Sequence, residues 1–248
     1  MLTDIQIGEN KERFELILMH NLHPEYNLSD YCAIDILNYL SETDFYIAPA
    51  SSKYHGNYKG GLCEHSLNVY DNLLLIYKTY KHLFNTEPIS DYTLALISLL
   101  HDICKIGIYK NSFRNAKKLD EKGAEILNKK GLPIWEKISY YEIDDNYPLG
   151  HGEKSVIILQ HFYQLTTIEI MSIRWHMGGY DDITKSFVGN MTANKAFNMY
   201  PLITLLHMAD LASIFLTLPI KDEEKLISQK EIDKIFYQTD EDLQKETF

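Results

Sequence analysis

The sequence predicts an all-α fold, and three observations support this prediction. Apolar residues recur mostly at helical spacings of three or four, and the alternating runs of Val, Ile and Thr that are typical of strands are nearly absent. With 248 residues, 45% of them hydrophobic, the chain is long enough to bury a substantial core. We therefore expect a single domain over residues 1–248, with N-terminal helices in 1–59, a core at 60–213 and a charged tail at 219–248.

The first ligand-bearing helix is expected to follow a break at Gly60 and Gly61. From Leu62 to Tyr80 the apolar residues keep a spacing of three or four, which is typical of one buried helical face. His65 therefore projects from the first turns of this helix.

The next helix is predicted to be buried on nearly all sides. Ser90 and Asp91 offer an N-cap before TLALISLLHDICKI, which is almost uniformly apolar, and Gly107 is a plausible stop. His101 and Asp102 come at the end of this buried run.

Two shorter helices follow an insertion. Residues 148–150 (Pro-Leu-Gly) place His151 at a helix start, and Thr166 with Glu169 forms a capping-box signature for a helix that ends near His176. Both histidines therefore lie at helix ends.

The last expected helix contains a single acid. Pro201 suits its first turn, and its apolar sequence LITLLHMADLASIFL isolates Asp210. Two segments lie outside the helical pattern. Residues 109–147 predict a lid-like insertion, and the charged tail is expected to be a surface helix.

Composition limits the class of protein. The net charge of −11 argues against a broad duplex-binding surface, but it allows a small anionic substrate in a metal-charged pocket. Cys32, Cys63 and Cys104 form no CxxC pair, so neither a disulfide framework nor a thiolate zinc site is expected, and a cytoplasmic location fits best. No window reaches the roughly 18 uncharged residues of a membrane-spanning helix. The sequence does not indicate an oligomeric state.

Six polar residues in or beside these apolar helices are candidate metal ligands, because burying an unpaired His or Asp is costly. They are His65, His101, Asp102, His151, His176 and Asp210. Imidazoles with carboxylates suit Mn, Fe, Ni, Co or Zn ions, and Mg is a further possibility. Adjacent helical residues point about 100° apart, so Asp102 can share one ion with His101 and still offer its second oxygen to another. Asp102 is therefore the expected bridge between two ions.

The motifs around these residues resemble those of the HD-domain metal-dependent phosphohydrolases. The likeness covers Gly60 to Ser213 and rests on GGLCEHSLNV, LLHDICKIG and HMADLAS. The chain is also similar to a subgroup of uncharacterised HD hydrolases of Firmicutes and their phages, in YHGNYKGGL, PLGHGEKS and IRWHMGGY. The resemblance implies an HD-domain helical bundle.

The resemblance also implies roles for individual residues. It places His65, His101, Asp102 and Asp210 around a first ion, and it makes His151 and His176 the extra ligands of the two-metal branch of the family. Lys105 matches the lysine that commonly follows the His-Asp pair, so Asp102 and Lys105 are the expected catalytic residues. Cys104 replaces the family's glycine, which questions the local backbone geometry. The GYP signature of the cyclic-di-GMP phosphodiesterases is not present.

Two ions roughly 3.5–4 Å apart would acidify a bridging water for in-line attack on phosphorus. Four further side chains are candidate ligands of the substrate phosphate: Lys53, His55, Arg114 and Lys154. His207 shares a helix face with Asp210, and its best role would be to orient that carboxylate.

We therefore expect a divalent-metal-dependent phosphohydrolase that cleaves a phosphomonoester or phosphodiester of a nucleotide or short oligonucleotide. Two alternatives remain open. One is a non-catalytic nucleotide-sensing module, which intact ligands at every expected position disfavour. The other is an exonuclease acting on single-stranded nucleic acid, which the lack of a β-rich nucleic-acid-binding segment disfavours.

Overall fold

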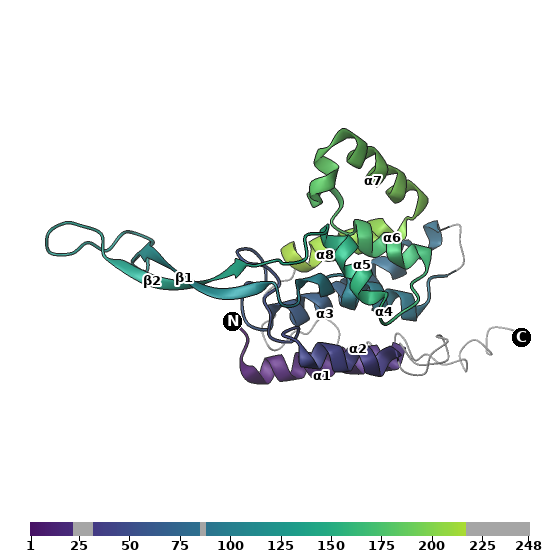
Figure 1. The fold of residues 1–248 in the computed structure, drawn as a ribbon, viewed down its shortest axis with the longest axis horizontal. Coiled ribbons are helices and arrows are strands. Elements are labelled where there is room, and N and C mark those ends of the chain that lie inside the picture. Colours follow the sequence, from purple (N-terminus) through teal and green to yellow (C-terminus); the bar gives the residue numbers. More distant parts are fainter. Residues whose placement is uncertain (22–31, 85–87, 217–248) are drawn as a thin grey trace, which may run out of the picture. The chain divides into compact units, whose positions relative to one another are not determined.

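A computed structural model describes residues 1–21, 32–84 and 88–216. Within these residues the chain is mostly helical, with eight α-helices and one two-stranded sheet (Figure 1). The helices are α1 (Asp4–Asn21), α2 (Cys32–Glu42), α3 (Gly61–Tyr80), α4 (Asp91–Leu100), α5 (His151–Leu159), α6 (Thr167–Trp175), α7 (Phe187–Met199) and α8 (Leu202–Phe215), and the strands are β1 (Tyr109–Lys117) and β2 (Trp135–Ile143). Residues Met1–Phe215 form one compact unit. The predicted tail at 219–248 lies outside the described residues.

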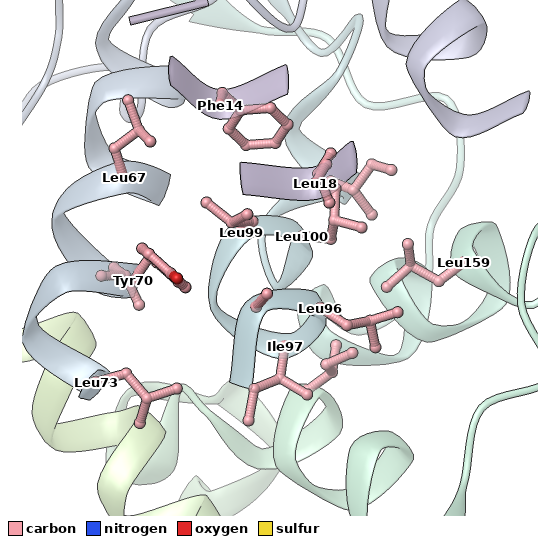
Figure 2. Packing of buried hydrophobic residues seen from close by; sticks show 14 of the residues in the cluster. Phe14, Leu18, Leu67, Tyr70, Leu73, Leu96, Ile97, Leu99, Leu100 and Leu159 are labelled. Carbon is pink, nitrogen blue, oxygen red and sulfur yellow. The ribbon is translucent and has the colours of Figure 1, made fainter. Parts of the chain in front are cut away.

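The core surrounds α4, as its uniformly apolar sequence predicts. Helix α3 packs on α4 and α8, helix α1 covers α3 and α4, and α5 and α6 pack on each other. Figure 2 shows Phe14 and Leu18 of α1 facing Leu99 and Leu100 of α4, with Leu67 of α3 alongside. All of these side chains are buried. Each fully buried leucine contributes about 1.5–3 kcal/mol, so this packing fixes the helices that carry the polar cluster.

The predicted caps are confirmed, and they place the candidate ligands. The Ser90 side chain accepts a hydrogen bond from the Thr93 amide at the start of α4, and Thr166 forms the capping box with Glu169 at the start of α6. Gly60 adopts a φ of 84° directly before α3, a conformation that favours glycine. These boundaries put the histidines in the first turns or at the ends of the helices, as expected.

The insertion between α4 and α5 is the main departure from the all-α prediction. Strand β1 pairs with β2 in antiparallel register from Tyr109↔Ile143 to Lys117↔Trp135, and the hairpin projects from the helices (Figure 1). Most of its residues are exposed on both faces. Burial therefore imposes no alternation of apolar and polar residues along the strands, which is the signal that sequence patterns can detect. Its role as a lid stays a prediction.

A membrane-spanning helix was not expected from the sequence. Among the described helices, none has the length and apolar character needed to cross a bilayer.

Candidate metal centre

The structure brings the six predicted ligands together from five helical regions. Each offers a nitrogen or oxygen atom to one of three overlapping groups, within which the atoms lie no more than 4.8 Å apart. The groups are His65, His101 and Asp102; His101, His176 and Asp210; and Asp102, His151 and His176. Because the groups share members, they form one continuous cluster.

The two carboxylate oxygens of Asp102 face different pairs of histidines. Its Oδ2 lies 3.4 Å from Nε2 of both His65 and His101. Its Oδ1 lies 2.6 Å from Nε2 of His151 and 3.6 Å from Nε2 of His176. The two oxygens of Asp102 are therefore directed to different sides of the cluster. The bridging role expected for Asp102 stays a prediction.

Backbone carbonyls orient two of the histidines. Nδ1 of His101 lies 2.8 Å from the carbonyl oxygen of Ser98, and Nδ1 of His176 lies 2.6 Å from that of Ile173. Both carbonyls are three residues earlier, in the last turn of α4 or α6. Since a carbonyl only accepts, Nδ1 of each ring is the protonated nitrogen and Nε2 keeps its lone pair for the cluster.

His65 receives an equivalent restraint from a serine. The hydroxyl of Ser213 donates a hydrogen bond to the carbonyl of Asp210 at 2.6 Å, and its oxygen lies 3.1 Å from Nδ1 of His65. With its proton directed to the carbonyl, the hydroxyl can accept from Nδ1. One residue of α8 thus orients the ligand from α3, while Oδ1 of Asp210 lies 3.3 Å from Nε2 of His65.

The donor set fits divalent cations. Nε2 of His65, His101 and His176 is buried, and none has a hydrogen-bond partner among the described residues. Leaving a buried polar atom unsatisfied costs about 1–3 kcal/mol. The neighbouring carboxylates of Asp102 and Asp210 add negative charge, so nitrogen lone pairs and oxygen ligands converge as Mn, Fe, Co, Ni or Zn sites require.

Charge around Asp102 keeps this carboxylate ionised. Burial favours its neutral form. The electrostatic effect of Lys105, with smaller effects of His101 and His151, outweighs burial and holds the pKa of Asp102 well below its usual value. Nζ of Lys105 lies 2.6 Å from Oδ2 of Asp102. Burial favours neutral Lys105 as well, but Asp102 outweighs it and raises the lysine pKa. The predicted catalytic pair is therefore an ion pair.

His151 is held differently from the other histidines. Its Nδ1 lies 3.3 Å from the sulfur of Cys104. Burial raises the pKa of the Cys104 thiol to about 12, so this sulfur stays neutral. The His151 side chain is 28% exposed, which is the largest exposed fraction among the side chains of the six candidate ligands. Solvent therefore reaches the cluster from the His151 side.

The four predicted substrate ligands occupy different places. The His55 ring lies against that of His65, with centroids 5.0 Å apart, and burial, followed by the charges of His65 and Lys105, lowers the pKa of His55 to about 4. Lys154 is buried on α5 and forms an ion pair with Asp145.

The other two predicted ligands are exposed. Lys53 lies in the loop before α3, and Arg114 lies on β1 with its guanidinium 5.6 Å from the Tyr140 ring centroid. Among the described residues, no hydrogen bond or ion pair joins either one to the cluster. Their substrate roles stay predictions.

Two neighbours of the cluster have contacts that the sequence did not predict. Nδ1 of His207 lies 2.6 Å from the carbonyl oxygen of His176, so His207 restrains the backbone of that ligand rather than the Asp210 carboxylate. Tyr109, which was not predicted, lies near Lys105 and Asp102. Burial raises its pKa to about 12, and both of these charges act on it. The sequence did not indicate that Tyr109 lies beside the cluster, because the strand that it begins was not predicted.

We compared the chain with models of protein families, with curated proteins and with solved structures, and none of these comparisons found a match.

Proposed function

We propose that this protein is a divalent-metal-dependent phosphohydrolase that cleaves a phosphomonoester or phosphodiester of a nucleotide or short oligonucleotide. One observation carries the proposal: the two carboxylate oxygens of Asp102 face two separate pairs of histidines. The motif likeness to the HD-domain phosphohydrolases supports the same reaction class.

Two divalent ions at this cluster would supply positive charge beside the phosphoryl oxygens and a water of lowered pKa. His65, His101, Asp102 and Asp210 would hold one ion, and His151 and His176 would complete the site of the other with Asp102.

The remaining chemistry belongs to side chains of this chain. Lys105 keeps its proton because its pKa is raised, so its ammonium can donate to a phosphoryl oxygen or to the oxygen of the leaving group. His55, with its pKa lowered to about 4, is neutral at pH 7 and its buried Nε2 has no hydrogen-bond partner among the described residues. It can therefore bind a substrate hydroxyl or phosphate as a neutral ring.

The proposal is tested with Asp102→Asn, which keeps the size of the side chain but removes the charge that two cations share. We expect the purified wild-type protein to contain transition metal and to hydrolyse a generic aryl phosphodiester or a nucleotide when Mn²⁺ is added. The variant should lose at least about a thousandfold in rate, because an amide cannot replace a shared carboxylate. Elemental analysis and product detection by mass spectrometry measure both properties.

The matched control is Asp182→Asn, which makes the same change in an exposed carboxylate paired with Lys185. It should retain metal and activity. Hydrolysis that survives both Asp102→Asn and chelation would contradict the mechanism. Tight nucleotide binding without turnover under any metal tested would favour the sensing module instead.

A further inference from the structure

The hairpin is connected to the metal centre at both of its ends. Strand β1 starts at Tyr109, whose side chain lies near Lys105 and whose hydroxyl donates a 3.4 Å hydrogen bond to the carbonyl of Ala50. Strand β2 ends at Ile143, and the chain then leads to His151, the most exposed of the six ligands. A molecule lying along the hairpin would therefore reach the open side of the cluster.

The strand register places four aromatic rings on one face. Residues that are paired across an antiparallel ladder share a face, as do alternate residues of one strand. The register therefore groups Tyr109, Phe113, Tyr141 and Trp135, which we call the aromatic face. Near the cluster the rings of Tyr109 and Tyr141 are in contact, with centroids 6.3 Å apart. Further out, Phe113 and Trp135 are 68% and 59% exposed.

Polar residues interleave these rings. Asn111, Asn115, Lys117 and Lys137 share the face by the same register. Lysine is depleted at the centre of protein–protein interfaces, whereas aromatic rings interleaved with lysine are typical of surfaces that bind single-stranded nucleic acid. The composition of this face thus favours an anionic partner with stacking groups over a second protein chain.

The charge of the hairpin also differs from that of the rest of the chain. Residues 109–143 contain eight Lys or Arg and five Asp or Glu, a net charge of +3. Because the whole chain has a net charge of −11, the remainder has −14. On net charge, the hairpin is therefore more favourable for an anionic polymer than the rest of the chain taken together.

We propose that the aromatic face binds a single-stranded polynucleotide, DNA or RNA, and directs it to the metal cluster. Bases stack on the exposed rings, and phosphates are contacted by Lys137 and by Lys117, which exchanges its ion pair with Glu125 for the phosphate. A duplex is disfavoured because its bases are already stacked on one another. The binding step stands on the hairpin alone, whereas delivery to the cluster rests on the proposed function.

The test measures binding without catalysis. Fluorescence anisotropy of labelled 12-nucleotide oligo(dT) and oligo(U) is recorded at low salt with a chelator present. We expect both oligonucleotides, or one of them, to bind the wild-type protein and a duplex of the same length to compete poorly. Binding should also quench the fluorescence of Trp135, which is exposed, whereas Trp175 is buried.

The double substitution Phe113→Ala and Trp135→Ala should weaken binding at least about tenfold, because each lost base contact reduces affinity severalfold. The matched control is Phe187→Ala on α7, which removes an 80% exposed ring from a different surface and should bind like the wild type. Lys137→Gln should reduce the salt dependence of binding.

Three results would overturn the inference. The first is equal affinity in the wild type and the double variant. The second is no measurable binding of either oligonucleotide by the wild type. The third is loss of a wild-type dimer in the double variant, measured by light scattering, which would assign the face to a second copy. Binding that persists while no phosphoester is hydrolysed would refute only the proposed function.

Discussion

At the scale of single residues, the cluster depends on which nitrogen of each imidazole is free. The carbonyls of Ser98 and Ile173 fix the protons of His101 and His176 on Nδ1. A metal ligand whose other ring nitrogen is hydrogen-bonded is held in one orientation and one tautomer. These outer contacts therefore prepare the site before any ion binds.

The Ser213 hydroxyl provides the contact of this kind that is easiest to remove. Ser213→Ala should weaken metal binding about 10–100-fold, because Nδ1 of His65 loses its acceptor and the ring gains freedom. Isothermal titration with Mn²⁺ or Zn²⁺ measures the change. Ser41→Ala is the matched control, since Ser41 also donates to the carbonyl three residues earlier but is exposed and remote. Unchanged affinity in Ser213→Ala would show that Ser213 does not orient His65.

The sequence indicated the polar residues that meet in the cluster, but not the residues that orient them. His65 and Asp210 were recognisable because each is a polar residue in an apolar helical run, and burial of such residues requires compensation. Ser213 carries no such signal, since a serine in a helix usually bonds to its own backbone. Arg114 was expected to contact the substrate phosphate, but no local pattern determines where this residue lies, and the structure places it on the hairpin.

At the scale of elements, the distance between α5 and α6 sets the spacing of two ligands. Gly152, directly after His151, lies against the backbone of α6. A Cβ at this position would come within 2.3 Å of the Arg174 carbonyl oxygen and 2.7 Å of the Ile173 carbonyl oxygen. The Ile173 carbonyl is the acceptor that orients His176. Close approach of these two helices therefore requires glycine.

Gly152→Ala should consequently weaken the binding of an ion at His151 and His176, because a methyl group would push the two helices apart. It should also lower the free energy of unfolding by about 1–3 kcal/mol. Urea denaturation and metal titration measure the two effects. Gly8→Ala is the matched control: Gly8 lies within α1, a Cβ there meets nothing within 4 Å, and the change should stabilise the protein by up to about 1 kcal/mol. Equal stabilisation by both substitutions would contradict this account.

Element prediction succeeded where local chemistry determines the outcome. The caps at Ser90 and Thr166 were visible because a side chain bonds to a backbone amide a few residues away. The hairpin was missed because its strands are stabilised by pairing between Tyr109–Lys117 and Trp135–Ile143, which are distant in sequence and largely exposed. The residue pattern of one strand does not indicate which other segment pairs with it.

At the scale of the molecule, the cluster connects helices that are far apart in the sequence. Residues from α3, α5 and α8 and from the ends of α4 and α6 meet within a few ångströms. Bound cations would therefore link most of the compact unit Met1–Phe215. Ions that bind only the folded chain also stabilise it by mass action.

Chelation should lower the melting temperature by about 5–10 °C, the shift expected when ligand at about a hundredfold above its dissociation constant is removed from a chain of this size. Differential scanning fluorimetry with and without EDTA measures it. His176→Ala should respond less than the wild type, since it lacks one ligand, whereas Lys185→Ala on the surface should respond equally. Identical melting temperatures for the wild type under both conditions would argue against resident metal.

The paired ends of the hairpin have an evolutionary consequence. Because the polypeptide leaves and re-enters the helices at neighbouring points, Tyr109 and Ile143, a shorter or differently composed ribbon could replace this one without displacing the polar cluster. A change in the hairpin could therefore alter what the protein contacts while the histidine cluster stays in place.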